Sequence, residues 1–330
     1  ISLGLILSYQ CNAQCRHCMY ACSPKWKGWI SEERLEDILR GLVGKIVPSP
    51  YGQQTASLNY GLHFTGGEPF LNFPLLLKAV TIATELKIPS TFVETNCFWC
   101  TADNVTEAKL RSLKEAGLKG ILISVNPYYL EFVPFERTER GIKIAQQIFG
   151  DNLMIYEWRY YTAFRKLGIN GKISLEDYLK RAEGANLASE VELFLMGRAA
   201  YQLTTLYPKR PPEQFFNEPC QPPFLREWHN HIDLYGNYLP GYCGGISLGN
   251  CQNLDECLEN GANLEQRPIL KLLMEQDFRG LFNFARDFGY SAPVEGYVSK
   301  CHLCLDIRRY LVTKREFEEL EPKEFYSYLE

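Results

Sequence analysis

The chain has no excess of basic residues and no long run of apolar ones. Its 330 residues include 35 Lys and Arg against 39 Asp and Glu, a net charge of −4. Proteins that bind nucleic acid usually carry a basic patch, so nucleic acid is not expected as a partner. No apolar run approaches the ~20 residues needed to span a bilayer, which excludes a membrane partner as well. Internal repeats and low-complexity tracts are also lacking.

The opening segment Ile1–Ser8 is apolar, but it lacks the basic residues and the cleavage site of a secretory signal. We expect it to be a buried strand of a longer chain. Hydrophobic residues make up 46% of the sequence, so a core of this size needs no disulfides to stabilise it. The 12 cysteines are therefore expected to bind metal in a reducing compartment, which predicts a cytoplasmic protein.

Three cysteines lie close together after the first strand-like segment. Cys11, Cys15 and Cys18 form a Cys-x3-Cys-x2-Cys run. Three thiolates on one loop can ligate three irons of a [4Fe–4S] cube and leave the fourth iron without a protein ligand. Clusters that only transfer electrons normally have all four irons ligated by cysteine. The spacing therefore indicates an iron that binds and cleaves another molecule.

A second motif follows the next strand-like run, Leu62–Thr65. It reads Gly66-Gly67-Glu68-Pro69 and precedes a helical pattern. Glycines suit a place where the backbone must approach a ligand closely or adopt a positive φ. Alone, this tetrapeptide would be read as a turn. Its position after the cysteine run favours a ligand-binding loop.

The two motifs resemble, in order and spacing, those of the radical S-adenosylmethionine (radical SAM) superfamily. The resemblance implies that Cys11, Cys15 and Cys18 hold a [4Fe–4S] cluster whose free iron binds S-adenosylmethionine (AdoMet). It also implies that the Gly66–Pro69 loop holds the AdoMet ammonium group. One electron from a donor such as ferredoxin or flavodoxin would then cleave AdoMet to a 5′-deoxyadenosyl radical, which abstracts a hydrogen atom from the substrate.

Residues 1–206 alternate between strand-like and helix-like patterns, which predicts an α/β fold with a parallel sheet and helices outside it. The expected strands are Ile1–Tyr9, Tyr60–Thr65, Thr91–Thr95, Ile121–Val125, Leu153–Tyr156 and Val191–Leu195. The expected helices are Leu35–Val43 with Ser31 as its N-cap, Pro74–Leu86, Val105–Ala116, Arg137–Phe149, Ser174–Ala182 and Ala199–Leu206. Six such units, with the resemblance, indicate a partial (β/α)6 TIM-type barrel. Both motifs then lie at the C-terminal edge of the sheet, where α/β proteins bind ligands.

The resemblance also implies further AdoMet contacts. Glu94 and Asn96 at the end of the third strand and Ser124 at the end of the fourth can bind the ribose hydroxyls, or can be ordinary polar strand ends. His17 stands where the family usually has an aromatic residue near the cluster and adenine, or it is a loop histidine. Arg198, in Met196-Gly197-Arg198-Ala199, can pair with the AdoMet carboxylate. The fifth strand shows no match to the adenine motif, so the adenine contacts stay unassigned.

Cys97 takes the position where many relatives have glycine after a Thr-Asn pair, and Cys100 follows it. A thiol at the mouth of the barrel could donate a hydrogen atom to a product radical. It could equally be a small buried apolar residue. Both interpretations of Cys97 stay open at the level of sequence.

A second set of cysteines lies in residues 207–330, beyond a proline-rich boundary. Cys301 and Cys304 form a Cys-x2-Cys pair, which presents both sulfurs to one centre from a turn. Cys220 and Cys243 flank Trp228–Asn237, a predicted β-hairpin that also contains His229 and His231, expected to be core or pocket residues.

This arrangement resembles the SPASM and twitch extensions of radical SAM enzymes, which hold an auxiliary [4Fe–4S] cluster. The ligands that it implies are Cys220, Cys243, Cys301 and Cys304, with Cys251 or Cys257 as substitutes. A structural zinc site with four cysteine ligands uses the same spacing and remains the alternative.

The sequence therefore predicts a radical SAM enzyme with a barrel over residues 1–206 and an auxiliary-cluster extension over residues 207–330. Such extensions are frequent among peptide and protein modifiers of the family. Because only ten residues precede Cys11, no separate peptide-recognition domain is expected there, and a small-molecule substrate stays open. The alternative from another class is a non-catalytic iron–sulfur or zinc protein that senses redox state or binds partners.

Overall fold

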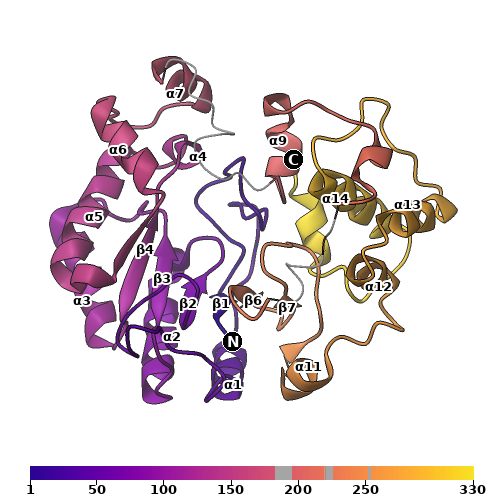
Figure 1. Cartoon of the computed structure of the whole chain (residues 1–330). Helices are drawn as coiled ribbons and strands as arrows, with labels where there is room; N and C mark the ends of the chain where they lie inside the picture. Colours follow the sequence, from indigo (N-terminus) through magenta and orange to yellow (C-terminus); the bar gives the residue numbers. More distant parts are fainter. Residues whose placement is uncertain (183–194, 219, 221–225, 252–253) are drawn as a thin grey trace. The chain divides into compact units, whose positions relative to one another are not determined.

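The computed structural model describes residues 1–182, 195–218, 220, 226–251 and 254–330, and the chain divides into two compact units (Figure 1). Unit 1 comprises Ile1–Cys15 and Cys22–Glu192, and unit 2 comprises Arg16–Ala21 and Leu193–Glu330. The short segment Arg16–Ala21 thus belongs with the C-terminal part of the chain. No helix in the described ranges is both long and apolar enough to cross a membrane.

Unit 1 is built on five parallel strands in the order β5-β4-β3-β2-β1. They are β1 (Leu3–Ile6), β2 (Leu62–Thr65), β3 (Phe92–Thr95), β4 (Gly120–Ser124) and β5 (Leu153–Tyr156). The order in space follows the order in sequence, as in a barrel and unlike a doubly wound sheet. The predicted α/β fold and its first five strands are confirmed. The sixth, Val191–Leu195, lies outside the described residues apart from Leu195.

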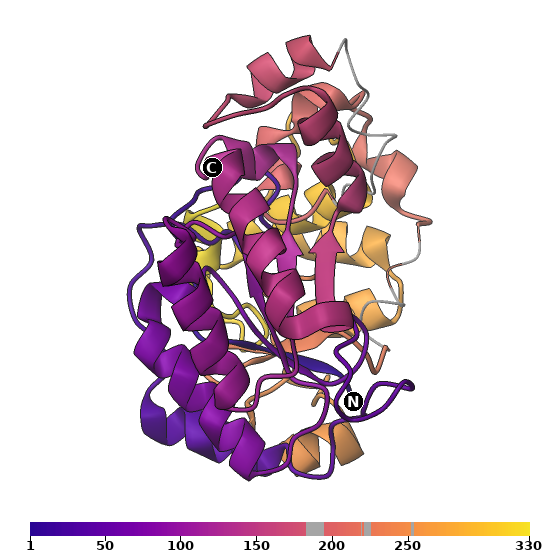
Figure 2. The ribbon, with the colours of Figure 1, turned by 90° about the vertical axis from the view of Figure 1, so that its left-hand side faces the viewer.

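The helices of unit 1 connect these strands and pack against one another along one face of the sheet (Figure 2). They are α1 (Glu32–Gly41), α2 (Phe73–Glu85), α3 (Asp103–Glu115), α4 (Pro127–Leu130), α5 (Phe135–Phe149), α6 (Trp158–Lys166) and α7 (Leu175–Arg181), with the 3₁₀ turns η1 (Pro69–Asn72) and η2 (Gly150–Asn152). The N-cap predicted at Ser31 is confirmed, and Ser174, predicted as the first residue of its helix, is also an N-cap. Ser31 accepts a hydrogen bond from the Arg34 backbone N–H, and Ser174 accepts one from Asp177.

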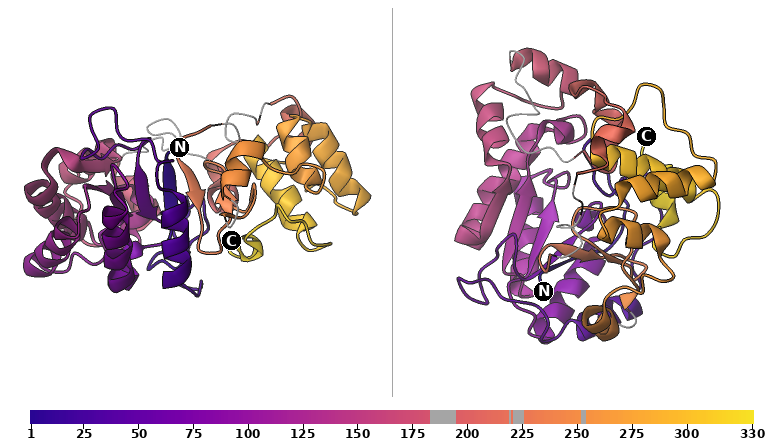
Figure 3. Two further views of the ribbon diagram at one scale, coloured as in Figure 1. Left: turned by 90° about the horizontal axis from the view of Figure 1, so that it is seen from below. Right: turned by 45° about the vertical axis from the view of Figure 1, so that its right-hand side comes forward.

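Unit 2 contains a β-hairpin and several helices. Its elements are α9 (Ala199–Gln202), η3 (Thr204–Leu206), η4 (Pro212–Phe215), β6 (Asn230–Ile232), β7 (Tyr238–Leu239), α11 (Leu254–Asn260), α12 (Pro268–Met274), α13 (Phe278–Asp287), α14 (Lys300–Leu311) and η6 (Lys323–Ser327). The antiparallel β6–β7 pair confirms the predicted hairpin. The Asp233 carboxylate stabilises its turn by accepting hydrogen bonds from the backbone N–H groups of Tyr235 and Asn237, each 2.9 Å long. Helix α14 packs against α9, α13 and η4 (Figure 3).

Candidate functional site

The cysteine loop and the glycine loop of unit 1 are hydrogen-bonded to each other beyond the ends of β1 and β2. The Gly67 N–H donates to the Ser8 carbonyl over 2.8 Å, and the Glu68 N–H donates to the Gln10 carbonyl over 3.0 Å. A Cβ on Gly67 would lie 1.9 Å from the Gln10 oxygen, and Gly66 has a φ of 125°. The two glycines are therefore needed because the backbone here lies against the loop that carries Cys11.

Gly67→Ala should destabilise the protein, because the added methyl group collides with backbone that cannot easily move. We expect the free energy of unfolding to fall by about 1–3 kcal/mol, the usual cost of overpacking. Gly41→Ala is the matched control, since a Cβ at this helical position meets no atom within 4 Å. Urea denaturation of both variants measures the difference. Equal stability would contradict the close packing of the two loops.

Glu68 is buried at the end of β2, with 1% of its surface exposed. Its carboxylate accepts hydrogen bonds from the Thr95 hydroxyl at 2.9 and 3.1 Å and from the backbone N–H groups of Asn96 at 2.9 Å and Phe70 at 3.2 Å. Burial raises the pKa of Glu68 to about 7, and these hydrogen bonds act in the opposite direction. A cationic ligand beside the carboxylate would favour its ionised form.

Asn96 connects this carboxylate to the cysteine loop. Its backbone N–H binds Glu68, while its side-chain amide donates to the Asn12 side-chain oxygen over 2.9 Å and to the Cys11 sulfur over 3.8 Å. Cys11 and Cys15 are buried in unit 1, while Cys18 is half-buried and belongs to unit 2. None of the three forms a disulfide bond, and metal ligation requires thiols that are not oxidised in this way.

The other predicted AdoMet residues of unit 1 also lie at strand ends. Glu94, on β3, accepts a hydrogen bond from the Thr65 hydroxyl over 2.6 Å and lies 3.6 Å from the ring of His63. Ser124 is the last residue of β4 and is half-buried. Pro69 begins η1, and Glu68 caps that turn. The ends of β2, β3 and β4 thus bring polar side chains to one edge of the sheet.

Cys97 and Cys100 are both buried in unit 1, and Cys97 has a φ of 63°. Burial raises the pKa of the Cys97 thiol, and the adjacent Cys100 raises it further. A Cβ on Gly141 of α5 would lie 2.6 Å from the Cys97 sulfur and 3.2 Å from the Cys100 sulfur. Gly141 therefore leaves space for both sulfurs. The role of Cys97 as a hydrogen donor stays a prediction.

In unit 2, the Met196–Ala199 turn packs on the segment Arg16–Ala21. A Cβ on Gly197 would lie 2.5 Å from the Cys18 carbonyl oxygen, and the Arg198 backbone N–H donates to this oxygen over 3.0 Å. The buried Arg198 guanidinium donates to the carbonyls of Ala21 over 2.8 Å and Tyr328 over 3.2 Å. Burial, then the Arg198 charge, lowers the pKa of His17 to about 4. This geometry places both predicted residues next to the Cys18 loop.

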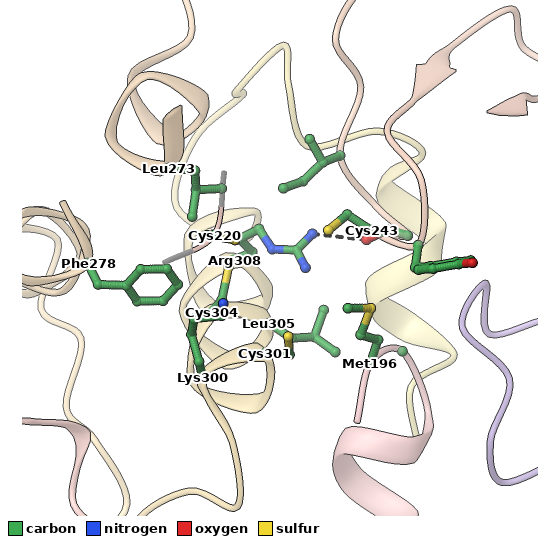
Figure 4. A pocket seen from close by; sticks show the side chains of 14 residues that line it. Met196, Cys220, Cys243, Leu273, Phe278, Lys300, Cys301, Cys304, Leu305 and Arg308 are labelled. Atoms are coloured by element: carbon green, nitrogen blue, oxygen red, sulfur yellow. Dashed lines mark hydrogen bonds between the residues drawn. The ribbon is translucent and has the colours of Figure 1, made fainter. Parts of the chain in front are cut away.

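Four cysteines of unit 2 line one pocket (Figure 4). They are the four predicted together, Cys220, Cys243, Cys301 and Cys304. The turn predicted for Cys301 and Cys304 is wrong. Both residues lie near the start of α14, where a three-residue spacing places their side chains on one helical face. Of the two substitutes, Cys251 is not among the lining residues, and the side chain of Cys257 lies outside the described part of the chain.

The four thiols make a donor set that suits a metal. Burial, together with the nearby cysteines, raises the pKa values of Cys220, Cys243 and Cys301 to about 12. Thiols crowded in this way ionise together only when a cation compensates their charge. Four cysteines are the ligand set of a [4Fe–4S] cluster or of structural zinc, and the chemistry of these donors suits either.

The protein has a parallel α/β sheet. At the C-terminal edge of this sheet the loop that carries Cys11 is hydrogen-bonded to the glycine loop that carries the buried Glu68. This site therefore combines cysteine thiols with a buried carboxyl group. Residues 5–155 match the sequence model of the Radical SAM superfamily. This part of the chain, a little under half of its length, is a radical SAM domain. The predicted superfamily and the prediction that the protein is an enzyme are confirmed. Membership in this superfamily implies a [4Fe–4S] cluster and AdoMet.

A curated relative is described as "Putative peptide biosynthesis protein YydG" from Bacillus subtilis (strain 168). It is 26% identical to this chain over 133 residues, which are 40% of this chain and 38% of the relative. The match thus spans well under half of the relative's length. A solved structure titled "Native anSMEcpe with bound AdoMet and Cp18Cys peptide" has a TM-score of 0.44 and 14% identity, covering 94% of this chain and 96% of the other.

Proposed function

We propose that the protein cleaves AdoMet reductively and uses the resulting 5′-deoxyadenosyl radical to abstract a hydrogen atom from a peptide substrate. The observation that carries the proposal is the link from Cys11 through Asn96 to the buried Glu68. It joins a proposed cluster ligand to a carboxylate that can receive the AdoMet ammonium. A [4Fe–4S] cluster held by Cys11, Cys15 and Cys18 would supply the electron and the iron site for AdoMet.

The protein's own side chains bind and orient AdoMet in this proposal. Glu68 accepts the ammonium group, while Thr95 and the Asn96 backbone hold its carboxylate in place. Glu94 and Ser124 bind the ribose hydroxyls from the ends of β3 and β4. The remaining proposed contacts are those of Gly66, Gly67, Pro69, Asn96, His17 and Arg198, with Cys97 as the hydrogen donor.

A peptide is proposed as the substrate because the curated relative carries the name of a peptide biosynthesis protein. The aligned 133 residues support the shared chemistry of the radical SAM domain more directly than they support a shared substrate. A small molecule is therefore the second candidate. The electron would come from a donor such as ferredoxin or flavodoxin.

Residues 207–330 form, in this proposal, a SPASM- or twitch-like extension, and residues 1–206 form the barrel. The supporting observation is that Cys220, Cys243, Cys301 and Cys304 line one pocket of unit 2. We assign an auxiliary [4Fe–4S] cluster to it, with zinc as the alternative occupant.

Formation of 5′-deoxyadenosine tests the proposed activity. The protein, reconstituted without oxygen, is incubated with AdoMet and dithionite, and the product is measured by liquid chromatography. Wild type should form it, and Cys11/Cys15/Cys18→Ala should form none, because the triple variant has no cysteines to hold the catalytic iron. Cys22→Ala is the control, since Cys22 is a buried cysteine that lies just outside the motif. Wild type that forms none would favour the sensor or binding module.

A further inference from the structure

Arg308 places a buried positive charge at the four-cysteine pocket. It lies on α14, four residues after Cys304, and 5% of its surface is exposed. Its side chain is one of those that line the pocket, and its guanidinium extends toward the side of Cys243 (Figure 4). One helical face therefore carries two of the four cysteines and a cation.

The hydrogen bonds of Arg308 connect α14 to the loop of Cys243. Its Nη1 donates to the Gly244 carbonyl over 2.9 Å and to the Tyr326 hydroxyl over 3.1 Å. Tyr326 in turn donates to the Gly245 carbonyl. Cys304 lies close enough to the guanidinium for the two groups to interact electrostatically. Arg308 thus fixes the position of the loop that presents Cys243 opposite Cys301 and Cys304.

The charge of Arg308 has no carboxylate partner among the described residues. Its hydrogen-bond partners are a carbonyl and a hydroxyl, and its Nε has no hydrogen-bond partner in the described part of the chain. A buried guanidinium without an anion is strongly destabilising. The groups around it that can become anionic are the cysteines, which ionise when they bind metal. The arginine and a metal–thiolate centre would therefore stabilise each other.

We infer that Arg308 is a positioning residue that compensates the negative charge of the auxiliary cluster and raises its reduction potential. The inference rests on the proposed auxiliary cluster. Reduction adds one negative charge to a site that is already anionic, and a nearby buried cation lowers the energy of the more negative state. Net charge and hydrogen bonds to the sulfurs are among the factors that set cluster potentials.

The test uses the Cys11/Cys15/Cys18→Ala protein, in which an auxiliary cluster would be the remaining source of iron. Arg308→Gln removes the charge and keeps a hydrogen-bonding side chain, while Arg308→Lys keeps the charge. Arg309→Gln is the matched control, because it removes a positive charge from the next residue of α14, where the arginine pairs with Glu330 at the surface. Iron and sulfide per chain and the midpoint potential, from an EPR-monitored redox titration, are measured for each.

We expect Arg308→Gln to shift the midpoint potential to a more negative value, and Arg308→Lys and Arg309→Gln to stay near the parent. If Arg308→Gln loses its iron, the iron content of Arg308→Lys tests the inference instead. Charge compensation requires that Arg308→Lys, which keeps the positive charge, also keep the cluster. Two results would overturn the inference about Arg308: an unchanged potential in Arg308→Gln with full iron, or loss of iron from both Arg308 variants. In either case the auxiliary cluster assigned to the parent protein would still stand. A parent that binds zinc or no iron would instead overturn the auxiliary cluster itself.

Discussion

Glu68→Gln should weaken AdoMet binding by about 10- to 100-fold, the loss expected for one charge-assisted hydrogen bond. The amide carries no negative charge for the AdoMet ammonium. One end of it is also an NH₂ group, which cannot accept the hydrogen bonds that Thr95 and the Asn96 N–H now donate to the carboxylate. The substitution therefore removes the attraction for the ligand and disturbs the network that holds the site together.

The same residue should make AdoMet binding depend on pH. Burial raises the pKa of Glu68 to about 7 in the free protein, so lowering the pH through this value protonates the carboxyl group before AdoMet binds. Affinity in wild type should therefore weaken as the pH falls from about 7.5 to about 6. For folding the sign is opposite. A raised pKa stabilises the folded protein at low pH, and this contribution is lost as the pH rises through about 7.

Calorimetric titration of the reconstituted protein with AdoMet at several pH values measures both effects. Glu107→Gln is a suitable control, because this exposed glutamate pairs with Arg111 on the surface of α3. Glu68→Gln should bind weakly at every pH and lack the wild-type dependence near pH 7. Wild-type affinity in Glu68→Gln, or the same pH dependence in both proteins, would show that this carboxylate does not receive the ammonium group.

Cys301→Ala/Cys304→Ala should remove the metal of unit 2 and leave that of the Cys11 motif. Wild type with two cubes would hold about eight irons per chain, and the double variant about four. The expected loss is complete at this site because α14 supplies half of the sulfurs that line the pocket. Iron, sulfide and zinc analysis after anaerobic reconstitution measures the result.

The same analysis separates the two possible occupants of the pocket. About four irons in both proteins, with zinc lost from the variant, would make the site structural zinc. Cys251→Ala is the control, since Cys251 does not line the pocket, and it should retain the wild-type metal content. Unchanged iron and zinc in the double variant would contradict a metal site at these cysteines.

Local interactions explain why much of the fold could be predicted from the sequence. The N-caps Ser31 and Ser174 bind backbone N–H groups three residues further along, so their effect is visible in the sequence itself. The strands β1, β2 and β3 are shorter than predicted, β4 is shifted by one residue from its predicted bounds, and β5 has the expected bounds. Apolar runs identify buried strands, but the residue at which pairing stops depends on the neighbouring strand.

Other features could not be predicted, because different structures share the same local pattern. A Cys-x2-Cys spacing fits a metal-binding turn and the first turn of a helix equally well. The sequence pattern predicts a turn at Cys301 and Cys304. It therefore does not predict that Arg308 lies on the same helix as these two cysteines. Helix α6 was missed as well. It begins Trp158-Arg159-Tyr160-Tyr161, and aromatic residues are weak helix formers, so its burial in unit 1 is what favours the helix.

The sequence by itself determined the superfamily, the order of the strands and the cysteines of both proposed metal sites, because these follow from short-range spacing. Only the tertiary structure brought Asn96, the residue after β3, to Cys11 and Glu68, and Arg308 to the carbonyl of Gly244. These contacts join residues 85, 28 and 64 positions apart. They form because strand pairing and helix packing bring distant segments together, and no local sequence pattern specifies such long-range contacts.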